Sequence, residues 1–271
     1  MKLNKFFTAT LALSGLALAG TSAKASVTAS DTDLILGFFS LNSSTGAAAQ
    51  ADVLTIDLGA ASQFYNATPG STFTLTGVTL ADLQGIYGSN WFSNTSNLLY
   101  WGIVGTAGSA TADGHAKAGT VWSTIASSAG SRAATSKSVL QIQVGHIQNL
   151  YSSLNGATAT SNSATATDDL TSDTNGYYQQ DNIASSASFG NINPLVDNNN
   201  STAVSGVEYS DLWELQQGTG LTGKGTATRL GTFALNSSGV LTFTAAPEPS
   251  TVTLAIGAGL AMLASRRRRL A

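Results

Sequence analysis

The stretch TFALNSSGVLTFTA, residues 232–245, has the pattern of two short strands joined by a tight turn. On both sides of the turn, apolar residues alternate with small or polar ones, as in a strand with one buried and one exposed face. Residues 236–239, Asn-Ser-Ser-Gly, have the composition of such a turn. We therefore predict an antiparallel hairpin here, and we expect the body of the chain to be built from similar strands.

Runs of the same kind recur along the chain. They are short, rich in β-branched and aromatic residues, and bounded by Gly, Asn, Ser or Pro. The predicted strands cover residues 33–40, 51–59, 71–77, 97–105, 226–236 and 239–245. The expected fold class is mainly β: one antiparallel β-sandwich-like domain with one or two helices set across it. A signal helix is expected before this domain and a hydrophobic helix after it.

Two segments have helical patterns. Thr79-Leu80-Ala81-Asp82 has the form of a capping box and predicts a short helix that Gly85 or Gly88 ends. Apolar residues at 3- and 4-residue spacing predict an amphipathic helix over residues 136–154. Gly145 costs this helix about 1 kcal/mol. The polar, low-complexity run at 156–176 predicts a mobile loop.

The first 25 residues have the three parts of a Sec-type signal peptide. Lys2 and Lys5 form a positive region, residues 6–19 are apolar and uncharged, and Ala23 and Ala25 fit the small-x-small pattern of a signal peptidase site. The alternative is an N-terminal membrane anchor, but 14 residues fall short of the roughly 20 that span a bilayer. We expect the mature protein to begin at residue 26.

Charge and cysteine content exclude several classes of function for the predicted body, residues 26–246. The chain has no cysteine, which excludes disulfides, thiolate metal sites and a cysteine nucleophile. Seven of the twelve basic residues lie in the end segments, so the body has five bases against fourteen acids, a net charge of −9. Such a body repels nucleic acid, so no nucleic-acid partner is expected.

Residues 247–264 combine a rigid start with a short apolar run. Pro247 and Pro249 fix φ near −65° and favour an extended backbone, which a protease binds readily. Residues 251–264 are 14 uncharged, mostly apolar residues. As a helix they rise about 21 Å against a hydrocarbon core of about 30 Å, so the span is marginal.

Four consecutive arginines follow this span. Arginines at the end of a span hold that end on the cytoplasmic side, which places the body across the membrane. This orientation agrees with the signal peptide. The cluster comprises Arg266, Arg267, Arg268 and Arg269.

The order of proline motif, hydrophobic segment and arginine cluster over residues 247–271 resembles the PEP-CTERM sorting signal. The resemblance implies recognition by exosortase in a Gram-negative bacterium that makes exopolysaccharide. The recognition residues would be Pro247, Glu248 and Pro249, and the arginines would stop transfer. It also implies an inner-membrane-anchored precursor that is then delivered to the cell surface or the extracellular matrix. A plain single-pass tail anchor is the alternative.

Motifs of chemistry are incomplete. Residues 218–225 nearly form a phosphate-binding loop, but Gly225 stands where a hydroxyl is needed, so a hairpin loop is the better interpretation. His115 and His146 are the only histidines, and neither lies in a triad or zinc motif. We expect no catalytic residue and no cofactor.

Two further clusters leave alternatives open. Oxygen ligands gather between Asp168 and Asp181, where either a calcium loop or a solvated loop is possible; Thr171 and Asn182 replace two of the carboxylates of a calcium loop. The oxygen cluster comprises Asp168, Asp169, Asp173, Asn175 and Asp181. Aromatic residues could line a sugar-binding face or pack in the core. They are Tyr87, Trp91, Phe92, Tyr100, Trp101 and Trp122.

The leading functional hypothesis is an exported, non-enzymatic surface or matrix protein, sorted by its tail. The alternative is a carbohydrate-binding module for exopolysaccharide, which exposed Trp91, Trp101 and Trp122 would favour. A second alternative is a secreted hydrolase, which needs two acids about 5–9.5 Å apart in a cleft.

Overall fold

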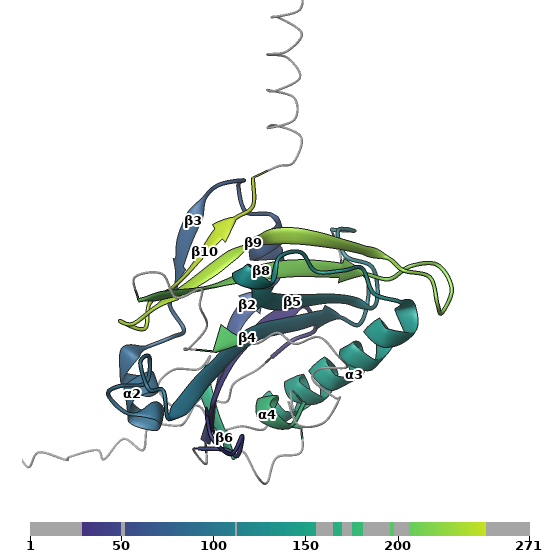
Figure 1. Cartoon of the computed structure of the whole chain (residues 1–271). Coiled ribbons are helices and arrows are strands. Elements are labelled where there is room, and N and C mark those ends of the chain that lie inside the picture. Colours follow the sequence, from purple (N-terminus) through teal and green to yellow (C-terminus); the bar gives the residue numbers. More distant parts are fainter. Residues whose placement is uncertain are drawn as a thin grey trace, which may run out of the picture.

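The computed structural model describes residues 29–49, 52–111, 113–155, 165–169, 175–180, 196–197 and 206–247. Within these residues, ten strands form one antiparallel sheet in the order β3-β10-β9-β8-β5-β4-β1-β2-β6, and β7 pairs with β4. The sheet curls around an apolar interior, with α3 and α4 on its outer face and α2 near one end (Figure 1). The mainly β, antiparallel fold is confirmed. The sandwich is wrong, because the strands form one continuous sheet.

The strands are β1 (Asp33–Asn42), β2 (Asp52–Ala60), β3 (Thr72–Leu75), β4 (Asn97–Ala107), β5 (Thr120–Ala126), β6 (Thr165–Asp169), β7 (Val196–Asp197), β8 (Val207–Gln216), β9 (Thr226–Asn236) and β10 (Leu241–Ala245). The α-helices are α1 (Ser62–Tyr65), α2 (Leu80–Tyr87), α3 (Lys137–Leu154) and α4 (Tyr177–Gln180). A 3₁₀ turn, η1, covers Ser127–Ala129.

The predicted hairpin is β9–β10. Leu241 pairs with Leu235 and Phe243 pairs with Phe233, so the apolar residues of both strands share one face. In the turn, the Oδ1 atom of Asn236 accepts backbone N–H groups of Ser238 and Val240 at 3.0 Å each. The alternation in the sequence therefore predicted both the pairing and the buried face.

The sheet has apolar side chains on both faces, so a single sheet forms two buried apolar clusters, one on each face. In β1, Leu34, Leu36 and Phe38 point into the curl, whereas Ile35 and Phe39 pack on the other face beneath α3 and α4. All five are 0% exposed. A strand buried on both faces has a continuous apolar run, as in DLILGFFS, instead of an alternating one.

Both predicted helices are confirmed. The side chain of Thr79 accepts the backbone N–H of Asp82 at 3.1 Å, and Gly88 ends α2 with φ at 85°. α3 begins after Ser136 and ends at Leu154, as its apolar spacing predicted. Its buried side, including Leu140, packs with α4 on the outer face of the sheet.

Part of the predicted loop at 156–176 is a strand. β6 pairs with β2 from Asp52 opposite Asp169 to Ile56 opposite Thr165. An edge strand pairs through its backbone and does not need a run of large apolar side chains, so a polar composition did not exclude it. The rest of the predicted loop, except for residues 175–176, lies outside the described residues.

The predicted signal peptide at 1–25 and the tail from residue 248 onward also lie outside the described residues. Of the helices in the part that is described, none has the length and apolar character needed to cross a membrane.

Candidate functional site

A cluster of polar and aromatic side chains lies where α1, the β4–β5 loop and β8 meet. We call it the Tyr65 cluster; it comprises Tyr65, Asp113, His115, Trp122 and Glu214. The short helix α1 supplies the tyrosine, the loop supplies Asp113 and His115, and β5 and β8 supply the other two. Residues from four parts of the chain thus meet in one network of contacts.

Glu214 is the buried centre of this cluster. Its side chain is 4% exposed, and its Oε2 atom accepts the indole N–H of Trp122 at 3.1 Å. The same oxygen lies 2.9 Å from Nε2 of His115, whose side chain is 37% exposed. Gln216 donates to the other oxygen at 2.6 Å. A buried carboxylate with several donors is stable where an isolated one would not be.

Tyr65 and His115 stack face to face at the surface. Their ring centroids lie 3.8 Å apart and their planes differ by 3°. The Tyr65 hydroxyl donates to Asp113 at 2.7 Å. Burial, together with this hydrogen bond and the Asp113 charge, raises the pKa of Tyr65 to about 12. The hydroxyls of Thr111 and Tyr65 lower the pKa of the Asp113 carboxyl well below its usual value. The tyrosine is therefore a neutral donor and Asp113 an anion at neutral pH.

The two rings are thus held in place by two carboxylates, one buried and one exposed. Such fixed side chains suit binding, because little conformational freedom is lost when a ligand arrives. Among the described residues, no group of three or more His, Asp and Glu side chains could hold a metal ion.

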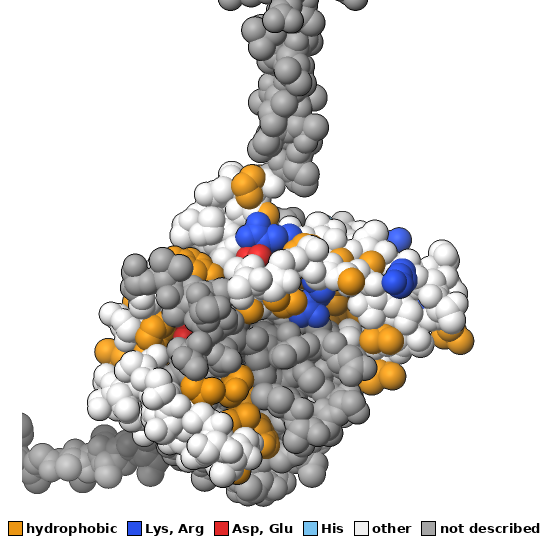
Figure 2. Space-filling view, in the orientation of Figure 1, with side chains coloured by type: hydrophobic (Ala, Val, Ile, Leu, Met, Phe, Trp, Pro, Cys, Tyr) orange, Lys and Arg blue, Asp and Glu red, His pale blue; other side chains and the backbone are white. Residues whose placement is uncertain are grey.

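A surface pocket of about 460 Å³ adjoins the Tyr65 cluster. We call it the exit pocket; it is lined by residues 64–69, by Arg229 and Leu230 of β9, and by residues 245–247. Nη2 of Arg229 donates to Asp211 at 2.9 Å and to Thr232 at 2.6 Å. The Arg229 side chain is 39% exposed. Figure 2 shows basic side chains gathered on the upper part of this face, over the region of β8 and β9.

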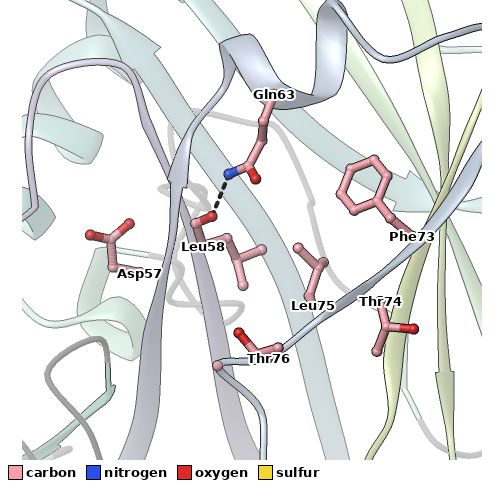
Figure 3. A pocket seen from close by; sticks show the side chains of 8 residues that line it. Asp57, Leu58, Gln63, Phe73, Thr74, Leu75 and Thr76 are labelled. Carbon is pink, nitrogen blue, oxygen red and sulfur yellow. Dashed lines mark hydrogen bonds between the residues drawn. The ribbon is translucent and has the colours of Figure 1, made fainter.

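A second hollow, of about 360 Å³, lies where the curled sheet does not close on itself. It is bordered by Asp57 and Leu58 of β2, by Gln63 and by residues 73–77. Figure 3 shows Gln63, Leu58 and Leu75 between β2 and β3, with the Asp57 carboxylate across the β2 ribbon from them. Gln63 donates to the Leu58 carbonyl at 2.6 Å. A side chain thus occupies the edge of β2 that another strand would pair with, which protects this edge from other chains.

Asp57 lies close to another acid, Asp33. Burial and, to a smaller extent, the Asp33 charge raise the pKa of Asp57 to about 6, whereas the N–H of Gly59 opposes the rise. Burial also raises the pKa of Asp33. Both carboxylates accept a backbone N–H nearby, Asp57 from Gly59 at 2.7 Å and Asp33 from Ser30 at 2.6 Å.

The tryptophans proposed for a sugar-binding face are core residues. Trp91 is 2% exposed, and Trp101 and Trp122 are 0% exposed. They therefore cannot offer a ring face to a glycan, which removes the observation that would have favoured a carbohydrate-binding module. Two of them donate to buried acids of β8, Trp101 to Glu208 at 2.6 Å and Trp122 to Glu214. These two acids bind indole groups in the core instead of facing a cleft.

The other predicted residues have mixed outcomes. Residues 218–225 form the loop between β8 and β9, as the hairpin interpretation predicted. His146 contacts Gln180 at 2.5 Å. Asp168 and Asp169 of the predicted calcium loop belong to β6, whereas Asp173 and Asp181 lie outside the described residues.

Of the predicted sorting residues, Pro247 is described and exposed, whereas Glu248, Pro249 and the arginine cluster lie outside the described residues. The predicted cleavage residues Ala23 and Ala25 also lie outside them.

The sequence reasoning missed the Tyr65 cluster. Its members are separated by up to 149 positions, from Tyr65 to Glu214, and no spacing rule joins them. The available sign was the glutamate within the apolar stretch DLWELQ, because a charged residue in a buried strand needs partners.

A comparison with known protein families finds no model that matches this chain. Comparisons with curated proteins and with solved structures likewise find no match.

Proposed function

We propose that the protein is an exported, non-enzymatic surface or matrix protein. A signal peptidase removes residues 1–25, and an exosortase recognises Pro247, Glu248 and Pro249 and processes the tail. The precursor is held in the inner membrane by residues 251–264 and oriented by the four arginines, and the product is delivered to the cell surface or the matrix. The observation that carries this proposal is the ordered sequence of motif, apolar segment and arginine cluster.

The boundary between folded body and tail supports this proposal. The β10 strand ends at Ala245 between β3 and β9, and the N–H of Ala246 donates to the Leu230 carbonyl at 2.8 Å. The next residue, Pro247, is exposed. Because β10 ends two positions before the exposed Pro247, an enzyme can reach the start of the motif without unfolding this strand.

The N-terminal boundary supports it in the same way. Ala29 is 5% exposed, and its backbone N–H donates to Oδ1 of Asn155, just after α3, at 2.8 Å. The predicted cleavage after Ala25 lies four positions before this contact. Signal peptide removal would therefore leave the folded body intact.

Replacing Glu248 with Ala tests the proposal. We expect the variant to remain inserted in the membrane and unprocessed, because the side chain needed for recognition is lost while the apolar span is unchanged. Ser250→Ala, a neighbouring change outside the motif, is the matched control and should be processed normally. Membrane fractionation and immunoblotting measure the outcome.

A strain that lacks the processing enzyme should give the unaltered protein the same fate as the Glu248→Ala variant. If Glu248→Ala is still shortened and delivered to the surface, the proposed sorting function is wrong.

A further inference from the structure

The exit pocket lies directly beside the point where the sorting motif begins. Ala245 pairs with Gly231, and the N–H of Ala246 donates to Leu230. Arg229 precedes Leu230 in β9 and Pro247 follows Ala246, and both residues line the pocket. Since the chain leaves the sheet at this pocket, Glu248 and Pro249 are one and two residues from its wall.

The pocket has a positive charge suited to Glu248. Both contacts described for Arg229 use Nη2, and the side chain is 39% exposed. A guanidinium carries five N–H donors in a planar fork, so its Nη1 side can donate hydrogen bonds to a second carboxylate. The body as a whole carries a net charge of −9, so an exposed arginine beside an acidic motif is a specific complement.

The pocket also has a wall suited to the two prolines. Tyr65 and Pro69 also line the pocket, and Tyr65 is held in place by its stack on His115 and its hydrogen bond to Asp113. Extended proline segments bind grooves lined by aromatic rings, because their backbone is already fixed before binding.

We propose that the exit pocket binds the chain's own Pro-Glu-Pro segment, residues 247–249, with Glu248 paired to Arg229 and Pro249 against Tyr65. The role of this docking in sorting rests on the proposed function, whereas the docking itself does not. A docked motif is unavailable to the processing enzyme, so the body competes with that enzyme for the motif.

The docking is weak and reversible. One exposed ion pair and a small contact with an aromatic ring make the docked state only about two- to five-fold more populated than the undocked state. Only chains with an undocked motif can bind the enzyme, so the undocked fraction sets the apparent affinity of the motif for the enzyme. Loss of docking therefore speeds processing by about two- to five-fold. High salt weakens the ion pair and acts in the same direction.

Disulfide trapping tests the docking, because the chain has no cysteine of its own. Thr68→Cys, in an exposed position of the pocket, and Ser250→Cys, one residue after the motif, are introduced together into the full chain in detergent. We expect an intramolecular disulfide that forms about two- to five-fold more slowly when Glu248→Gln is added. Glu248→Gln leaves every residue of the folded body unchanged, so a fold defect cannot explain the result.

Two further variants sharpen the test. Arg229→Gln should slow trapping as Glu248→Gln does, whereas Arg229→Lys should retain most of it. Lys224→Gln, which removes a basic residue of the β8–β9 loop, is the matched control and should leave trapping unchanged. A trapping rate that is independent of Glu248 overturns the proposal, as does a disulfide that forms only between molecules.

The same variants separate docking from sorting. In cells, Arg229→Gln should be processed about two- to five-fold faster than the parent. If trapping depends on Glu248 but the tail is never cleaved in cells, the docking stands and the proposed sorting function is wrong.

Discussion

The Nε2 atom of His115 lies 2.9 Å from Oε2 of Glu214, and this contact joins an exposed loop to a buried strand. Glu214 also accepts hydrogen bonds from Trp122 and Gln216. The carboxylate is therefore the common partner of three side chains, one of which is fully buried. Its loss affects the core, whereas loss of His115 affects mainly the loop.

Glu214→Ala should lower the free energy of unfolding by about 2–4 kcal/mol, because it leaves the buried indole N–H of Trp122 without its acceptor. His115→Gln should cost less than about 1 kcal/mol, because this partner is exposed to water. Urea unfolding followed by tryptophan fluorescence measures both. Equal losses in the two variants would contradict this account of the network.

Tyr87→Phe should lower the free energy of unfolding by about 1–3 kcal/mol. The Tyr87 hydroxyl donates to the Phe38 carbonyl at 2.6 Å and accepts the N–H of Leu54 at 3.1 Å. These two residues are a cross-strand pair of β1 and β2, so the hydroxyl fastens α2 to the sheet. Tyr209→Phe, a half-buried tyrosine of β8, is the control and should change stability by less than about 0.5 kcal/mol.

Much of this fold could be predicted because apolar patterns report burial directly. The hairpin β9–β10, the continuous run of β1 and the capped helix α2 each have a local sequence pattern that tertiary contacts did not override. The strand β8 was missed because Glu208, Asp211 and Glu214 interrupt its apolar pattern. Two of these acids are buried with indole partners from β4 and β5, a contact that no local pattern contains.

That all these strands belong to one curled sheet could not be predicted for a related reason. Alternation says which side chains are buried but not whether two faces belong to one sheet or to two. Here β5 pairs with β8 across a gap of more than 80 residues, which makes the sheet continuous. The exit pocket likewise depends on residues 64–69 lying beside β9 and the end of β10, which are far apart in the sequence. The sequence predicted the Pro-Glu-Pro motif at residues 247–249 but not the pocket beside it.

Two glycines should respond in opposite ways to replacement by alanine. A Cβ atom at Gly37, in the middle of β1, would overlap the buried ring of Tyr177, so Gly37→Ala should cost about 1–3 kcal/mol. A Cβ atom at Gly145, within α3, meets nothing within 4 Å, so Gly145→Ala should stabilise by about 0.5–1 kcal/mol. Thermal unfolding monitored by circular dichroism gives the sign of each change. A stabilised Gly37→Ala variant would contradict the packing described for α4.

Asp57→Asn should raise stability at pH 7 and lose this advantage as the pH falls. Burial raises the folded pKa of Asp57 from 3.8 to about 6, so the folded state binds a proton more tightly than the unfolded state. In the unaltered protein, Asp57 therefore lowers the free energy of unfolding above about pH 6, and this loss is recovered as the pH falls from 6 toward 3.8. Asn keeps an oxygen that can accept the N–H of Gly59 and has no charge to desolvate.

The measurement is the melting temperature of parent and variant between pH 4 and pH 7.5. Asp33 also has a raised pKa, so both proteins retain some pH dependence and their difference is the informative quantity. If the difference in melting temperature between the two proteins is constant across this range, the charge of Asp57 does not destabilise the folded state.

Under the proposed sorting function, replacing Arg266, Arg267, Arg268 and Arg269 with Ser should release the unprocessed precursor through the membrane. Each arginine opposes passage through the bilayer centre by about 2.5–3.5 kcal/mol, and the span of 14 residues before them is too short to anchor the chain firmly by itself. This failure differs from that of Glu248→Ala, which should stay inserted. A variant with four lysines at these positions keeps the charge and should be retained, which separates charge from arginine geometry. If the serine variant remains in the membrane fraction and is processed as fast as the parent, the arginines are not what stops transfer.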